Sequence, residues 1–203
     1  MCIGMLNSEK DDRQPNDALL LMQVAQGDID ALEQLFARYR RPIYTLAQSI
    51  TRSNETAEEI LQDTFYRLYT NATKLDGSQP LLPWLYRVAA NLSYNSARRG
   101  WNLMEPITLL TERLFAPHGR SPEHLAEQHE IQDIVHATLE ELPMNHRAVL
   151  ALFYLHEYSI QEVAEILELP EGTIKSRLFH ARKLLKQRLV RRFGGASALL
   201  DQI

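Results

Sequence analysis

The apolar positions of this chain recur every three or four residues, which is the spacing of one helix face. The first such pattern follows Asp28, a residue suited to an N-cap, and continues beyond Pro42, where we expect a kink or a break. The second begins near Asn54, and the third spans about residues 83–99, after the turn sequence LDGSQP at residues 75–80. No sustained strand-like alternation is visible, so the pattern predicts helices throughout.

The periodicity dissolves over residues 100–121 and returns at Ser121-Pro122, where a serine N-cap and a proline at the first helical position favour a new helix. We therefore expect an all-α protein of two small helical domains, at residues 17–100 and 122–193. An irregular linker at residues 101–121 would join them, and residues 1–16 and 194–203 would be tails. The linker is apolar enough to predict that part of it packs on a partner or forms a short helix.

The end of the second domain has the pattern of a helix-turn-helix. Ser159 and Glu162 are spaced as a capping box, and a break at residues 169–172 separates a short helix from a longer one. In the longer helix Ile174, Leu178, Ala181 and Leu185 would face inward. The side chains expected to face outward are Lys175, Ser176, Phe179, His180 and Lys183. This arrangement is typical of a second helix that enters the major groove of DNA.

Charge supports that interpretation although the net charge of the 203-residue chain is −4. Residues 172–193 contain eight basic side chains and no acidic one, which suits a polyanion. Residues 54–63 contain four acidic side chains and no basic one, which could meet a basic protein surface. For each run the alternative is a solvated helix face.

The helix at about residues 83–99 carries a second stripe opposite its core face. It consists of aromatic, amide and guanidinium groups, with no acid between residues 83 and 101: Trp84, Arg87, Asn91, Tyr94 and Arg98. Such groups stack on unpaired bases and pair with phosphates. The alternative is that Trp84 is a core residue and the arginines are solvated.

These segments resemble the extracytoplasmic-function (ECF) sigma factors of bacterial RNA polymerase. The resemblance rests on AEEILQDTFYRLY at residues 57–69 and PWLYRVAANL at residues 83–92 in the first domain. In the second it rests on Leu142-Pro143, Glu162-Val163-Ala164 and GTIKSRL at residues 172–178. Together the matches cover about residues 17–192, in the family's order.

The resemblance implies a subunit that binds core RNA polymerase, at the clamp helices of its largest subunit and at its flap region, and directs it to promoters. The implied polymerase-binding residues are Glu59, Leu61, Gln62, Asp63 and Phe65. The implied single-strand contacts at the minus-ten element are Asn71, Lys74, Asp76, Gly77, Trp84, Arg87, Asn91 and Arg98. The implied duplex contacts at the minus-thirty-five element are Thr173, Lys175, Ser176, Arg177, Phe179, His180, Arg182 and Lys183. An anti-sigma factor is a further implied partner.

The chain departs from the family's pattern at three places. His180 stands where arginine is usual, so one contact is lost, altered or pH-dependent. Asn95 stands where aspartate is common, and the prolines at 80 and 83 stiffen the loop exit. These departures leave the function intact but put the promoter sequence in doubt.

Two other classes of protein are alternatives. A dimeric operator-binding regulator would carry the same helix-turn-helix but leaves the two N-terminal motifs unexplained. An enzyme is disfavoured by the lack of GxxxxGK[ST], GxSxG and HExxH motifs, and no cofactor or metal is expected. We expect a cytoplasmic protein with no membrane partner. The chain has a single cysteine, Cys2, and shows neither a signal sequence nor a long apolar run.

Overall fold

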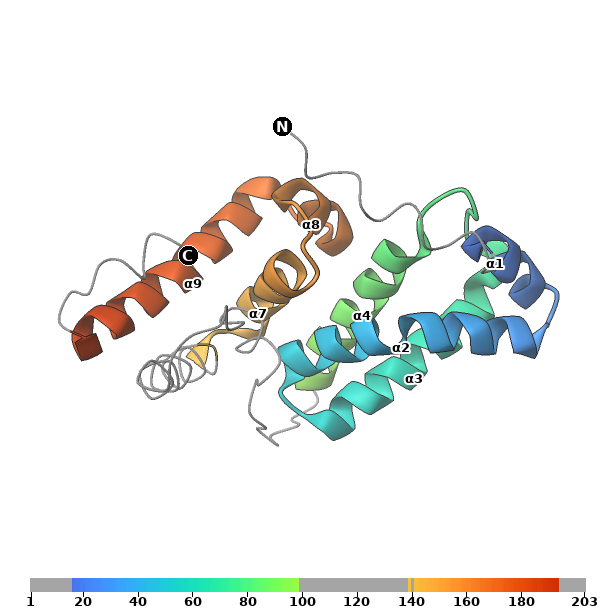
Figure 1. Ribbon diagram of the computed structural model, residues 1–203, viewed down its shortest axis with the longest axis horizontal. Coiled ribbons are helices and arrows are strands. Elements are labelled where there is room, and N and C mark those ends of the chain that lie inside the picture. The colour runs from blue at the N-terminus through green and yellow to red at the C-terminus, as the bar shows by residue number, and fades with distance from the viewer. Residues whose placement is uncertain (1–15, 99–138, 140, 194–203) are drawn as a thin grey trace, which may run out of the picture.

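The N-terminal half of the chain folds into a bundle of four α-helices (Figure 1). The computed structural model describes residues 16–98, 139 and 141–193. The helices of the bundle are α1 (Asp17–Ala25), α2 (Ile29–Thr51), α3 (Asn54–Asn71) and α4 (Leu81–Arg98), with a 3-10 turn, η1 (Ala72–Lys74), after α3. Side-chain caps fix where the first three helices begin, since Asn16, Asp28 and Ser53 each accept a backbone N–H of the first turn.

Helix α2 runs unbroken through Pro42, so a break at this residue, one of the two outcomes expected from the sequence, does not occur. An interior proline costs about 3 kcal/mol. Leu35 before it and Ile43 and Leu46 after it are all fully buried. Each such burial contributes about 1.5–3 kcal/mol, which is enough to keep both segments in one helix against the same core.

The C-terminal half contains the helix-turn-helix predicted from the sequence. Helix α7 (Met144–Leu150) continues into a π-helical turn, η2 (Ala151–Leu155), and is followed by α8 (Ile160–Leu167) and α9 (Glu171–Phe193). The capping box is present, with Ser159 and Glu162 each bonded to the other's backbone N–H. Helix α8 ends at Leu167, and the φ of 54° at the C-cap residue Glu168 turns the chain toward α9.

The two halves pack on each other through α2 and α4 on one side and α7 and α8 on the other (Figure 1). Arg147 is 7% exposed and donates to the Ile50 carbonyl at the end of α2, with Nε at 3.0 Å, and to the Leu142 carbonyl at 2.6 Å. Tyr86 of α4 is 1% exposed, and its hydroxyl lies 2.7 Å from Nδ1 of His156.

The helical class is confirmed for the described residues, which contain no strand. The predicted linker at residues 101–121, residues 1–15 and 194–203 of the predicted tails, and the helix expected to start at Ser121-Pro122 lie outside them. Within the described part of the chain, no helix is long and apolar enough to cross a membrane.

Candidate nucleic-acid and polymerase interfaces

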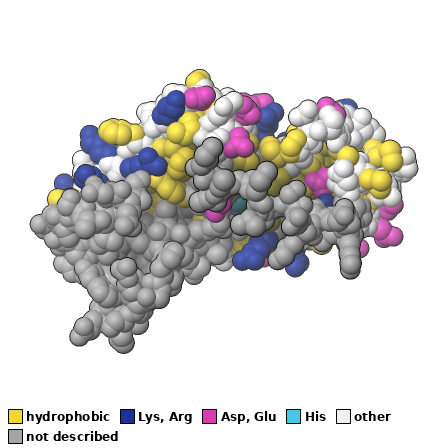
Figure 2. All heavy atoms as spheres, turned by 45° about the horizontal axis from the view of Figure 1, so that its top comes forward, with side chains coloured by type: hydrophobic (Ala, Val, Ile, Leu, Met, Phe, Trp, Pro, Cys, Tyr) yellow, Lys and Arg dark blue, Asp and Glu magenta, His cyan; other side chains and the backbone are white. Residues whose placement is uncertain are grey.

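The first half of α9 presents one polar face and one buried face. Ile174, Leu178 and Ala181 are at most 4% exposed and pack toward α7 and α8. On the outer face Lys175, Ser176, Phe179, His180 and Lys183 are exposed, and Phe179 shows 67% of its surface. Lys175 also forms a 2.9 Å ion pair with Glu171, one turn earlier. Dark-blue basic side chains lie over α9 at the left of Figure 2.

Two of the arginines predicted to contact DNA also bond to groups of the protein itself. Arg177 donates to the Asn145 carbonyl at 3.3 Å. Arg182 donates to the Tyr154 hydroxyl at 2.8 Å and lies over the rings of Phe153 and Tyr154, with its guanidinium carbon 5.7 and 5.6 Å from their centroids. Both side chains, like Thr173, are only partly exposed. They therefore brace α9 against α7 and η2.

The loop between α3 and α4 carries the first group of predicted single-strand contacts. Asp76 accepts the Ser78 N–H at 2.9 Å, and this hydrogen bond lowers the pKa of the Asp76 carboxyl. Asn71 donates to the Arg67 carbonyl at 2.9 Å, while the Lys74 side chain is exposed. A Cβ at Gly77 would lie 3.6 Å from Ala18, in ordinary contact with α1. The loop is thus ordered by local hydrogen bonds and rests on α1.

The residues of the predicted second stripe of α4 lie in different environments: some face solvent, one packs against the core, and one contacts the C-terminal half. Asn91 is exposed and Trp84 is partly buried, whereas the side chain of Arg98 lies outside the described ones. Tyr94 packs against the core, and burial raises the pKa of its phenol. The orientation expected for Tyr94 is therefore wrong, because the C-terminal half covers this side of α4.

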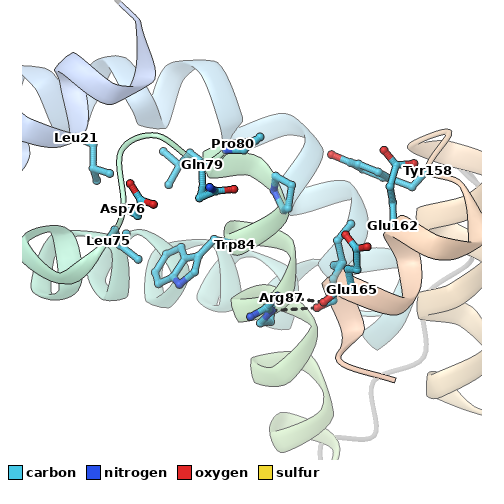
Figure 3. A pocket seen from close by; sticks show the side chains of 13 residues that line it. Leu21, Leu75, Asp76, Gln79, Pro80, Trp84, Arg87, Tyr158, Glu162 and Glu165 are labelled. Carbon is cyan, nitrogen blue, oxygen red and sulfur yellow. Dashed lines mark hydrogen bonds between the residues drawn. The ribbon is translucent and has the colours of Figure 1, made fainter. Parts of the chain in front are cut away.

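Arg87 spans the two halves (Figure 3). Its guanidinium donates to the carbonyls of Glu165 at 3.0 Å and Ile166 at 3.3 Å, and pairs with the Glu168 carboxylate at 2.9 Å. These acceptors lie in the last turn of α8 and at its C-cap, where the helix dipole favours a cation. Arg87 therefore caps α8 in this conformation.

Beside Arg87 lies a cavity of about 550 Å³ between the halves. Trp84, Asp76 and Gln79 line it from the first half, and Tyr158, Glu162 and Glu165 line it from the second (Figure 3). Its carboxylates outnumber its one guanidinium, so its charge does not favour a phosphate. The cavity is a consequence of how the halves meet.

The acidic face of α3 is exposed at the residues predicted to bind polymerase. Glu59, Gln62 and Asp63 are exposed, and Leu61 is partly buried. Phe65 is 5% exposed and packs edge-on against Phe36, with ring centroids 4.9 Å apart. Phe65 therefore positions the helix, while the three polar side chains are the ones a partner can reach.

Sequence reasoning missed the residues that join the halves, namely Tyr86, Arg147 and His156. Tyr86 follows Leu85 in the core stripe, yet both are buried because α4 is covered on two sides. Burial lowers the pKa of Arg147 to about 10, with Arg52 contributing, so the group stays charged at neutral pH. Hydrophobic periodicity cannot predict a buried arginine. Arg147 is buried because its guanidinium bonds to the Ile50 carbonyl, which is far away in the sequence.

Two family models match the chain, Sigma-70 region 2 over residues 35–102 and Sigma-70, region 4, over residues 132–185. A helical bundle with an acidic face, followed by a helix-turn-helix with a basic outer face, defines a transcription initiation factor of this class. The chain is 30% identical to the ECF RNA polymerase sigma factor SigW of Bacillus subtilis, over 83% of this chain and 94% of that protein. It is 33% identical to the ECF RNA polymerase sigma factor SigM of the same organism, over 76% of this chain and 93% of that protein.

This chain belongs to the ECF RNA polymerase sigma factor family. As a sigma factor it binds core RNA polymerase and promoter DNA and directs promoter-specific initiation. The fold also resembles the sigma factor RpoE in its complex with the anti-sigma factor NepR from Bartonella quintana. That likeness has a TM-score of 0.56 at 21% identity, over 77% of this chain and 95% of that one.

Proposed function

We propose that the chain contacts its promoter at two points, with α9 in the minus-thirty-five duplex and with the α3–α4 loop and α4 on the minus-ten strand. The observation that carries the proposal is the outer face of α9. Lys175, Ser176, Phe179 and His180 are all exposed on one side of a helix whose other side is buried. Lysine and serine can bond to base edges, and an exposed phenyl ring can pack on a thymine methyl.

The minus-ten contacts are proposed for the loop residues Asn71, Lys74, Asp76 and Gly77 and for Trp84, Arg87, Asn91 and Arg98 of α4. An unpaired base must be extruded at a cost of a few kcal/mol, which stacking and hydrogen bonds in a fitted site can offset. The ordered loop supports this role, because a site with fixed hydrogen-bonding groups loses little entropy when a base enters.

Polymerase binding is proposed for Glu59, Gln62 and Asp63. Arg87 is engaged by α8 in the present conformation, so it can contact DNA only after the two halves separate. We therefore propose that the halves open when polymerase holds each of them at its own promoter element. A domain division at residues 17–100 and 122–193, with a linker between them, fits this motion.

An anti-sigma factor is a proposed partner, since the similar sigma factor RpoE was solved with one. We further propose a cytoplasmic location and no catalytic activity of the chain alone, because its work is done on polymerase and DNA. For the same reason, and on its family membership, we favour this function over a dimeric operator-binding regulator.

The test is transcription from a promoter library by purified core polymerase with and without the protein. Factor-dependent run-off transcripts that share two sequence elements are expected. If the protein instead forms a dimer that binds palindromic duplex DNA tightly without polymerase, the two-point proposal fails.

A further inference from the structure

Two histidines from different helices meet at the edge of the outer face of α9. His180 lies on that face and is exposed, and His146 lies in the first turn of α7, where it is partly buried. Their ring centroids are 5.8 Å apart and the ring planes are inclined by 51°. Nδ1 of His146 lies 3.0 Å from Oδ1 of Asn145, so a small anionic group placed between the two rings would accept a hydrogen bond from Nε2 of His146 and one from His180.

The surroundings of this pair are cationic. Arg177, which is anchored to the Asn145 carbonyl, acts electrostatically on His146, and so does His180 itself. Lys183 lies three residues beyond His180 on α9, and the Tyr94 phenol of α4 interacts with Arg177. On α7, the next residue Arg147 points away to the end of α2.

The carboxylates of α8, the other helix packed on α9, are held elsewhere. Their partners are Ser159 for Glu162, Gln161 for Glu165 and Arg87 for Glu168. Glu171, in the first turn of α9, is paired with Lys175. None of these carboxylates is a cause of the pKa shift of His146. A proton on His146 is therefore opposed by Arg177 and by burial, and none of these four carboxylates offsets that effect.

We propose that His146 and His180 together bind one backbone phosphate of the upstream promoter duplex and take up a proton when that duplex docks. This inference rests on the proposed placement of α9 in the major groove. A helix in that groove is flanked by phosphates, and the first helix of the motif, here α8, crosses the backbone. His146 lies on α7, which packs beside α9, and meets His180 at the edge of the outer face, so we expect it to contact a flanking phosphate and not a base edge.

The coupling to protons has a definite direction. In the free protein, partial burial lowers the pKa of His146 below 6.5, with Arg177 and His180 adding to the effect. A bound phosphate supplies the missing negative charge and favours the imidazolium, so the DNA-bound state binds more protons than the free state. Affinity therefore rises as pH falls through the interval between the two pKa values.

The test measures the affinity of the reconstituted holoenzyme for a labelled promoter at constant ionic strength, from about pH 8 to about pH 6. The wild type should gain about three- to tenfold in affinity over the variant H146Q/H180Q across this range. His180→Arg, a permanent cation, should bind tightly with a shallower pH slope. The single variant His180→Gln should fold, because His180 is exposed. It therefore tests the pair even if variants that contain His146→Gln unfold.

A second measurement locates the partner. Replacing single phosphates of the promoter with uncharged methylphosphonates should remove the pH-dependent part of the affinity at one position, in the wild type and not in H146Q/H180Q. Equal pH slopes in the two proteins would overturn the proposal. So would a change of preferred base in His180→Gln with no response to any methylphosphonate, which would assign the histidine to a base. Loss of all factor-dependent transcription would instead be a failure of the proposed function.

Discussion

Phe179 and Phe65 show that the position of a phenylalanine on its helix determines whether its ring is buried or exposed. Both are phenylalanines on amphipathic helices, yet Phe179 is 67% exposed and Phe65 is 5% exposed. Leu178 and Ala181 already supply the buried face of α9, so helical spacing leaves Phe179 outside. An exposed ring on a basic helix is available to a partner, and the thymine methyl groups of the major groove are suitable partners.

Lys175 offers the sharpest test at this scale. Lys175→Ala should weaken binding of the holoenzyme to its preferred upstream element by about 1–3 kcal/mol and relax the sequence preference at one position. Loss of its exposed ion pair with Glu171 should cost the fold less than about 0.5 kcal/mol. Selection from a promoter library randomised in the upstream element measures the preference.

The matched control is Lys186→Ala, an exposed lysine farther along α9. It should lower affinity about equally for all sequences. An unchanged sequence preference in Lys175→Ala would assign that lysine to phosphate.

At the scale of the element, the N-terminal capping box of α8 makes stability depend on pH. Hydrogen bonds from Ser159 lower the pKa of the Glu162 carboxyl below its usual value near 4.5. The folded state thus prefers the carboxylate, so the stabilisation is complete above pH 4.5 and is lost as pH falls through the folded-state pKa.

Glu162→Gln should therefore lower the free energy of unfolding at neutral pH by about 0.3–1 kcal/mol, and the difference from the wild type should vanish in acid. Urea unfolding at a series of pH values measures it. Parallel stability profiles for the two proteins would contradict the assigned role of Glu162.

Arg147 joins α7 to the end of α2. Arg147→Met should lower the free energy of unfolding by about 2–4 kcal/mol, because it removes charge-assisted hydrogen bonds and leaves the Ile50 carbonyl buried without this donor. Arg147→Lys should also destabilise, since an ammonium cannot replace the planar fork. Thermal unfolding is the measurement, and Arg191→Ala, at an exposed arginine of α9, is the control that should change little.

The helices themselves could be predicted from the sequence because each has a periodic apolar face and a local cap. Asp28, Asn54 and Ser159 mark three of the starts within one or two residues. Periodicity identifies the face of a helix that packs on its own domain, but it cannot show which other helices cover the remaining faces. Periodicity puts Tyr94 and Arg177 on outer faces, but both are partly buried: Tyr94 packs against the core, and Arg177 bonds to the Asn145 carbonyl of α7.

At the scale of the whole molecule, polymerase binding should depend on the acidic face of α3. Gln62→Ala with Asp63→Ala should abolish co-purification with core polymerase, since it removes exposed polar groups from the proposed docking face without touching the core. Circular dichroism should show an unchanged helical content. Glu33→Ala with Gln34→Ala, an equivalent exposed pair on α2, is the matched control. If both double variants co-purify equally, α3 is not the docking face.

The capping of α8 by Arg87 has a quantitative consequence for competition among sigma factors. If only a fraction of the free chains is open, the apparent affinity for polymerase falls by that fraction. Each 1.4 kcal/mol of contact between the halves, roughly, makes the factor tenfold less competitive for a limited pool of polymerase. If the halves open as proposed, the strength of this contact sets the concentration at which the factor competes for polymerase.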